Sequence, residues 1–160
     1  MKPSILNIAH RGASGTAPEN TVAAFRAAIA AGAGMCELDV QPTRDHAVVV
    51  IHDDTVDRTT DGQGAVKEMT LAELKRLDAG ARFSGAPWRD EPIPTLDEVF
   101  AATAGQCALN VELKSGQVEK EVVALMHKWK ALETSMVSSF DWVKLARVRE
   151  LEVTVRIGVL

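Results

Sequence analysis

Short apolar runs alternate with helix-like segments along this chain. This alternation limits the set of possible folds more than any other feature of the sequence. The apolar runs cover residues 5–9, 35–40, 47–51, 107–113, 135–140 and 153–160. The helix-like segments cover residues 22–31, 96–104, 118–131 and 141–150. Strands that alternate with helices form crossover units, which build a parallel sheet or barrel. We therefore predict an α/β fold.

The length and composition fit one globular domain. The chain has 160 residues, of which 46% are hydrophobic and 25% charged, and this balance excludes a largely disordered or fibrous chain. Its 18 basic and 22 acidic residues give a net charge of 18 − 22 = −4, and no basic run appears. Since nucleic-acid binders concentrate Lys and Arg on one face, we expect no nucleic-acid partner.

Some apolar side chains are expected in the core. Four of them occupy helical positions: Met126, Trp129, Trp142 and Leu145. Cys36 and Cys107 lie far apart in apolar surroundings, which favours buried, reduced thiols over a disulfide.

The first residues are not expected to form a targeting or membrane segment. The apolar run turns polar at His10, and no stretch of the chain reaches about 18 apolar residues. Together with the reduced thiols, this predicts a cytoplasmic protein that does not insert into membranes.

Residues 54–94 interrupt the alternation. Their first part is rich in Thr, Asp and Gly, and their last part is punctuated by Gly and Pro. Between these parts, Thr70 and Glu73 resemble a capping box that opens a short helix ending at Leu77. A segment this long without a place in the strand-helix rhythm predicts a small inserted subdomain.

Chemically active side chains cluster where the predicted strands end. They are His10, Arg11, Glu37, Asp39, His52, Asp53, Glu112 and Lys114. Residues two apart on a strand face the same way, so Glu37 and Asp39 project together, as do Glu112 and Lys114. Because the carboxyl ends of parallel strands meet at one opening, we expect a single compact site.

The residue types in this site indicate phosphodiester cleavage. Three carboxylates placed together repel each other unless a cation lies between them, and oxygen ligands suit Mg²⁺ or Ca²⁺. The Arg and Lys beside such an ion would bind a phosphate. Two histidines titrate near neutral pH and can act as general base and general acid.

Each residue also has a plain structural alternative. A lone His at a strand end is more often hydrogen-bonded structure than a catalyst, and Glu112 with Lys114 would also make an ordinary surface ion pair. For Glu19 and Asn20, loop fixing and helix capping are favoured over direct chemistry.

The site closely resembles the signature of the glycerophosphodiester phosphodiesterase family, in its bacterial cytoplasmic type. The four parts of that signature stand here in the same order and local spacing: His10-Arg11, Glu19-Asn20, Glu37-Leu38-Asp39 and His52-Asp53. Residues 111–114 and 138–140 are also similar, so the resemblance covers nearly the whole chain from Ile5 onward.

The resemblance implies a (β/α)8 TIM-type barrel in which residues 54–94 form a cap over the opening. Such a barrel needs about 250 residues, and residues 1–160 supply five or six strands. The chain also ends on an apolar strand, which in a parallel sheet is buried between neighbours. The barrel is therefore expected to be incomplete here, without its C-terminal strands.

The resemblance also implies hydrolysis of glycerophosphodiesters to an alcohol and sn-glycerol 3-phosphate. The implied roles are the acid-base pair His10 and His52, the phosphate-binding Arg11 and Lys114, the metal ligands Glu37, Asp39 and Glu112, and the supporting Glu19 and Asn20. In the family's mechanism a glycerol hydroxyl attacks phosphorus and water opens the cyclic phosphate, whereas the residues alone allow direct attack by water equally.

Two other functions stay open at the level of sequence. One is a phospholipase D-like or phosphoinositide-cleaving enzyme, which would act on long-chain lipid. The other is a non-catalytic fragment that binds a metal or a phosphodiester. Carboxylate ligands serve both Mg²⁺ and Ca²⁺, the sequence does not select the alcohol headgroup, and a homo-oligomer is compatible with the sequence.

Overall fold

The computed structural model describes residues 5–84 and 88–160, which form an α/β fold as predicted. Its strands are β1 (Ile8–His10), β2 (Met35–Pro42), β3 (Val48–Val50), β4 (Ala108–Leu113), β5 (Met136–Ser139) and β6 (Arg156–Val159). Its helices are α1 (Val22–Ala30), α2 (Leu71–Leu74), α3 (Leu96–Thr103), α4 (Glu119–Lys128) and α5 (Trp142–Leu151), with a 3-10 turn, η1 (Val66–Glu68). Most predicted elements recur with ends shifted by one to three residues.

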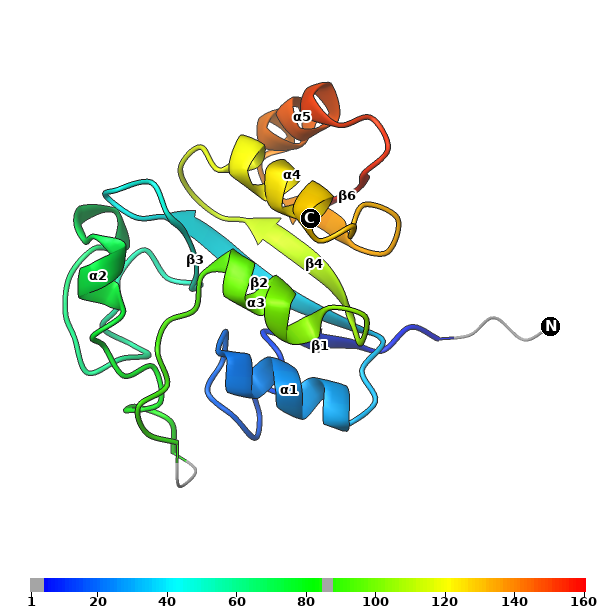
Figure 1. The fold of residues 1–160 in the computed structure, drawn as a ribbon. Coiled ribbons are helices and arrows are strands. Elements are labelled where there is room, and N and C mark those ends of the chain that lie inside the picture. Colours follow the sequence, from blue (N-terminus) through cyan, green and yellow to red (C-terminus); the bar gives the residue numbers. More distant parts are fainter. Residues whose placement is uncertain (1–4, 85–87) are drawn as a thin grey trace.

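The strands form one sheet in the order β1-β2-β4-β5-β6, and all neighbours along this path are parallel. Helices α1, α3, α4 and α5 follow one another along the sheet (Figure 1). This is the arrangement that strand-helix crossovers produce.

The prediction of a parallel sheet is wrong for one strand, β3. It pairs antiparallel with the end of β2, with Val40 opposite Val50 and Pro42 opposite Val48. The five residues 43–47 join the two strands, and a parallel crossover needs a dozen or more. The connection is therefore a hairpin, which carries the chain back along β2.

Helix starts follow their capping residues. The side chain of Thr21 accepts a hydrogen bond from the backbone of Ala24 at the start of α1. Thr95 and Glu98 form a capping box on α3, and Thr70 and Glu73 form the predicted one on α2. Helix α2 is shorter than predicted and ends at Leu74.

The main core lies between the sheet and its helices. Leu38, Val40 and Val111 point into it from the central strands, and Phe25 and Val99 fill it from α1 and α3. Successive side chains of a strand point to opposite faces. The acidic residues that alternate with these apolar ones therefore lie on the face that the helices do not cover.

A second, smaller cluster joins the end of β3 to residues 54–84 and 88–94. The segment 54–94, which the sequence predicts to be an inserted subdomain, is called the insertion below. Val56, Val66, Leu74 and Ile93 pack there against Val49 and Ile51, at and just after β3. The insertion lies beyond the arrowheads of β2 and β4, so it stands at the carboxyl end of these strands (Figure 1).

The predictions for single core residues were mostly confirmed. Met126 and Leu145 are buried, and Trp129 is partly buried against the core. Trp142 is a correction: its side chain is 70% exposed, because it is the first residue of α5 and precedes the buried stripe of that helix. Both cysteines are free thiols, with Cys36 buried and Cys107 half-buried.

Candidate active site

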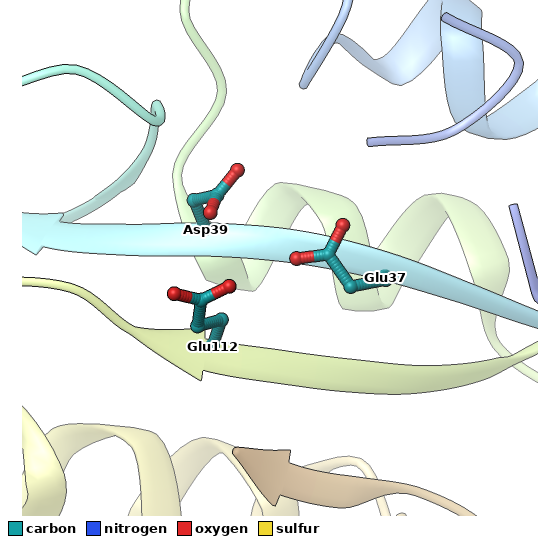
Figure 2. A group of neighbouring side chains, drawn as sticks. All are labelled: Glu37, Asp39 and Glu112. Carbon is teal, nitrogen blue, oxygen red and sulfur yellow. The ribbon is translucent and has the colours of Figure 1, made fainter. Parts of the chain in front are cut away.

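Glu37, Asp39 and Glu112 form a cluster at the carboxyl end of the central strands. Glu37 and Asp39 lie two apart on β2, and the sheet register sets Asp39 directly beside Glu112 on β4. Each offers one carboxylate oxygen, and these oxygens lie within 4.8 Å of one another. Figure 2 shows the three side chains on the same face of the two strands, with helix α3 on the other side of the sheet.

The cluster suits a divalent cation. All three side chains are buried, with 7%, 1% and 7% exposure for Glu37, Asp39 and Glu112. Burial, and next the charge of Asp39, raise the pKa of Glu37 to about 7. Within the described residues, Glu37 Oε1 and Asp39 Oδ1 are buried without a hydrogen-bond partner. Such orphaned anionic oxygens are costly unless a ligand contacts them, and a hard cation is the matching ligand.

Arg11 lies on one side of the carboxylates. Its backbone N–H donates to Glu37 Oε2 at 3.0 Å, and its guanidinium Nε lies 3.4 Å from Asp39 Oδ2. Its Nη1 donates to Glu19 Oε1 at 2.9 Å. Arg11 has a positive φ of 57°, a conformation that costs a non-glycine residue free energy and is typical of functional turns.

Lys114 lies on the other side. Its Nζ donates to Glu112 Oε1 at 2.9 Å and lies 3.8 Å from Asp39 Oδ1. Two cations therefore flank three carboxylates, as the sequence predicts. An anion that approached the cluster would find a positive group on either side.

The two predicted histidines differ in their surroundings. His10 is 68% exposed at its side chain, and its Nε2 lies 3.8 Å from Glu37 Oε2. His52 is partly buried, with Nδ1 2.6 Å from Asp53 Oδ1 and Nε2 3.2 Å from Lys114 Nζ. The hairpin explains this second position, because β3 runs back along β2 and returns His52 to the carboxylates.

Glu19 and Asn20 contact charged side chains of the site, and neither caps the helix, because the N-cap of α1 is Thr21. Asn20 Nδ2 donates to Asp39 Oδ2 at 2.8 Å, which holds that buried carboxylate. Its φ of 58° is tolerated by Asn better than by most residues. Glu19 accepts hydrogen bonds from Arg11 and from Arg58.

Two residues near the site were missed by sequence reasoning. Gln41 is buried two positions after Asp39, and its Nε2 donates to the backbone carbonyls of Ile51, His52 and Asp53. Its place on the same strand face as Asp39 is the signal that marks it. Arg58 contacts Glu19 and Asp53, and its position in a Thr- and Asp-rich loop gives no comparable signal.

Comparison with known proteins places residues 10–160 within the sequence model of the glycerophosphoryl diester phosphodiesterase family. A glycerophosphodiester phosphodiesterase of Caldanaerobacter subterraneus subsp. tengcongensis is 46% identical, over 97% of this chain and 66% of its own length. One from Bacillus subtilis is 37% identical, over 92% of this chain and 56% of its own. The chain thus spans less than two thirds of the length of these relatives.

Solved structures give the same picture. A glycerophosphodiester phosphodiesterase from Agrobacterium tumefaciens superposes with a TM-score of 0.89 at 34% identity, over 96% of this chain and 66% of that one. A phosphodiesterase from Oleispira antarctica, in complex with its product sn-glycerol-3-phosphate, also gives 0.89, at 36% identity, over 97% of this chain and 65% of that one. Among the described residues of the present chain, helices that are both long and apolar enough to cross a membrane are absent.

Proposed function

The chain belongs to the glycerophosphoryl diester phosphodiesterase family, and we propose that it carries the site at which a glycerophosphodiester is hydrolysed to an alcohol and sn-glycerol 3-phosphate. The observation that carries the proposal is the convergence of three buried carboxylates, two flanking cations and two imidazoles at one end of the sheet. The product named for the Oleispira relative fits this chemistry.

We propose that Glu37, Asp39 and Glu112 hold one divalent cation, Mg²⁺ or Ca²⁺. The two orphaned oxygens, Glu37 Oε1 and Asp39 Oδ1, support this assignment. When bound, such an ion supplies positive charge that polarises a phosphoryl oxygen and the group attacking it.

Arg11 and Lys114 are proposed to bind the phosphate. The Arg11 fork and the Lys114 ammonium flank the carboxylates, so a phosphate between them gains charge-assisted hydrogen bonds on both sides. These bonds strengthen as negative charge accumulates on the equatorial oxygens, which lowers the barrier to displacement at phosphorus.

His52 and His10 are proposed to act as the acid-base pair. Asp53 beside Nδ1 of His52 favours the tautomer in which Nδ1 carries the proton, so Nε2 can accept one. One imidazole removes a proton from the attacking hydroxyl, and the other returns a proton to the leaving oxygen. The attacking hydroxyl is either a glycerol hydroxyl, which gives a cyclic phosphate that water opens, or water itself.

The insertion and the barrel complete the proposal. We propose that the strands belong to a (β/α)8 barrel. This is supported by the superposition of this chain on about two thirds of the length of each of two solved relatives. We propose that the insertion is a cap that shapes the pocket, which is supported by its place beyond β2 and β4. The cytoplasmic location and any homo-oligomer stay predictions from the sequence.

The test is release of sn-glycerol 3-phosphate by the purified protein from glycerophosphocholine and glycerophosphoethanolamine. Release is expected with Mg²⁺ or Ca²⁺, is expected to stop with a chelator, and should return when the metal is restored. Phosphorus NMR during turnover distinguishes the cyclic phosphate route from direct hydrolysis. Cleavage of long-chain phospholipid vesicles alone would favour the lipase-like alternative, and metal binding without any turnover would favour a binding fragment.

A further inference from the structure

Arg58, in the insertion, contacts two carboxylates that come from different parts of the chain. Its Nε and Nη2 donate to the two oxygens of Asp53, at 2.7 and 3.0 Å. Its Nη1 and Nη2 donate to the two oxygens of Glu19, at 2.8 and 2.7 Å. One guanidinium therefore makes four hydrogen bonds and holds both carboxylates in a fork geometry.

One arm of this arrangement runs from Glu19 into the site. The same Oε1 of Glu19 that accepts from Arg58 also accepts from Arg11 Nη1 at 2.9 Å. Arg11 Nε in turn lies 3.4 Å from Asp39. Any shift of Glu19 is thus transmitted to the cation that we propose binds phosphate.

The other arm runs from Asp53 to Asp39, the carboxylate that the first arm also reaches. Asp53 Oδ1 lies 2.6 Å from His52 Nδ1, and His52 Nε2 lies 3.2 Å from Lys114 Nζ. Lys114 Nζ lies 3.8 Å from Asp39. The two arms therefore meet at Asp39 and form a closed ring, in which cationic and anionic side chains alternate on either side of the His52 imidazole.

The ring differs from an ordinary surface ion pair. An exposed pair contributes little because two long side chains must be held in place for it, whereas Glu19 and Asp53 are each held by further partners within the site. The hydrogen bonds from Arg58 are the largest cause that lowers the pKa of Asp53, to about 2, and they also lower the pKa of Glu19. Both carboxylates therefore stay charged at neutral pH, and the ring stays intact.

Trp88 also joins the insertion to this part of the molecule. Trp88 Nε1 donates to the backbone carbonyl of Thr16 at 3.2 Å, in the loop that carries Glu19. Arg58 contacts both sides at once: the loop after β1 through Glu19, and the residues after β3 through Asp53.

We propose that Arg58 is a positioning residue. By holding Asp53 it positions His52, and by holding Glu19 it positions Arg11. Docking of the insertion and alignment of the acid-base and phosphate-binding groups therefore occur together. The kinetic part of this proposal rests on the phosphodiesterase function proposed above. The docking part does not, because it concerns contacts that exist without substrate.

The test compares Arg58→Gln and Arg58→Lys with a matched control, Arg76→Gln. Arg76 is exposed in the same insertion, and among the described residues its side chain has no hydrogen bond to the site. For Arg58→Gln, kcat should fall about 10- to 100-fold, since small misplacement of reacting groups has effects of this order, while KM changes less. Arg58→Lys should recover part of kcat, because an ammonium keeps the charge but not the fork. Arg76→Gln should match the wild type.

Hydrogen-deuterium exchange supplies a readout without turnover. Arg58→Gln should speed exchange in residues 52–60 and 11–21, and Arg76→Gln should not. If the wild type releases no sn-glycerol 3-phosphate, the proposed function fails, and exchange alone still decides whether Arg58 docks the insertion. Unchanged exchange in Arg58→Gln overturns the docking role, and a kcat within about twofold of the wild type overturns the positioning role.

A double-mutant comparison separates positioning from general destabilisation. If Arg58 acts through Asp53, adding Arg58→Gln to Asp53→Asn should lower kcat far less than it does in the wild type. Fully additive losses in kcat would mean that the two residues act independently, which contradicts the proposal.

Discussion

Asp53 Oδ1 lies 2.6 Å from Nδ1 of His52, which leaves Nε2 of the same ring facing the site. The carboxylate accepts a hydrogen bond from Nδ1–H, so the lone pair of the neutral imidazole is on Nε2, where Lys114 Nζ lies 3.2 Å away. The adjacent residue Asp53 thus determines the tautomer of the proposed base.

Asp53→Asn is expected to lower kcat by about 10²- to 10⁴-fold, the range attributed to general acid-base groups. The amide can donate to Nδ1 and so favours the wrong tautomer. The matched control is Asp54→Asn, an exposed neighbour whose side chain has no hydrogen bond or ion pair among the described residues. Turnover by Asp53→Asn within a few-fold of Asp54→Asn would contradict the proposed role of Asp53.

His10→Ala and His52→Ala are each expected to abolish release of sn-glycerol 3-phosphate without loss of metal binding. The proposed ligands are carboxylates, and neither imidazole is among them. Metal binding is measured by calorimetry with Mg²⁺ and with Ca²⁺, and turnover by product release. His46→Asn is the control, since His46 is exposed in the hairpin turn and its φ of 64° suits Asn. Full turnover in either alanine variant would exclude that histidine from the acid-base pair.

Glu37→Gln is expected to weaken metal binding and yet to preserve or raise stability in a chelator. Burial and the charge of Asp39 already raise the pKa of Glu37 to about 7, so a neutral amide relieves repulsion in the metal-free protein. In the wild type, metal at about 100 times its Kd should add about 2.7 kcal/mol to the free energy of unfolding. Thermal unfolding with metal and with chelator measures both effects, and an equal metal-induced rise in Tm for wild type and variant would contradict the ligand assignment.

Much of the fold follows from local sequence pattern, because apolar runs and capping residues act over short distances. The capping box of Thr95 and Glu98 marks the start of α3. Glu37 and Asp39 lie on one face of β2, as residues two apart on a strand must. The direction of β3 was predicted wrongly for a physical reason. A β-branched run reads the same in either direction, and only the short connection 43–47 excludes a crossover.

The site was predictable to the extent that its residues end strands. Glu37, Asp39 and Glu112 lie together as expected, since strand register brings them side by side. Arg58 was missed because its partners, Glu19 and Asp53, are distant or separated by a loop. Which loop cation reaches which carboxylate depends on tertiary packing, and no sequence period encodes it.

Gly12→Ala is expected to destabilise the protein by about 1–3 kcal/mol, the cost of a strained backbone position. Gly12 has a φ of +77°, and an added Cβ would lie 2.7 Å from the backbone carbon of Ala24. Gly15→Ala is the control, because nothing lies within 4 Å of its added Cβ and its φ is outside the left-handed range. Urea unfolding compares the two variants with the wild type. A loss no larger than that of Gly15→Ala would show that the turn after Arg11 relaxes without cost.

The ion pair of Asp53 with Arg58 predicts a pH-dependent part of stability. Arg58, and to a lesser extent His52, lower the pKa of Asp53 from its ordinary 3.8 to about 2. A carboxyl with a lower pKa in the folded state stabilises the protein above the pKa of the unfolded chain, and this contribution is lost as pH falls through the folded value. The free energy of unfolding of wild type minus Asp53→Asn should therefore be constant near neutral pH and shrink between pH 3.8 and 2. Because the side chains of Arg58 and Asp53 are 47% and 29% exposed, solvent screens part of their attraction, and the difference should be about 1 kcal/mol or less. Urea unfolding at stepped pH measures it, and a difference that grows on acidification would have the wrong sign for this ion pair.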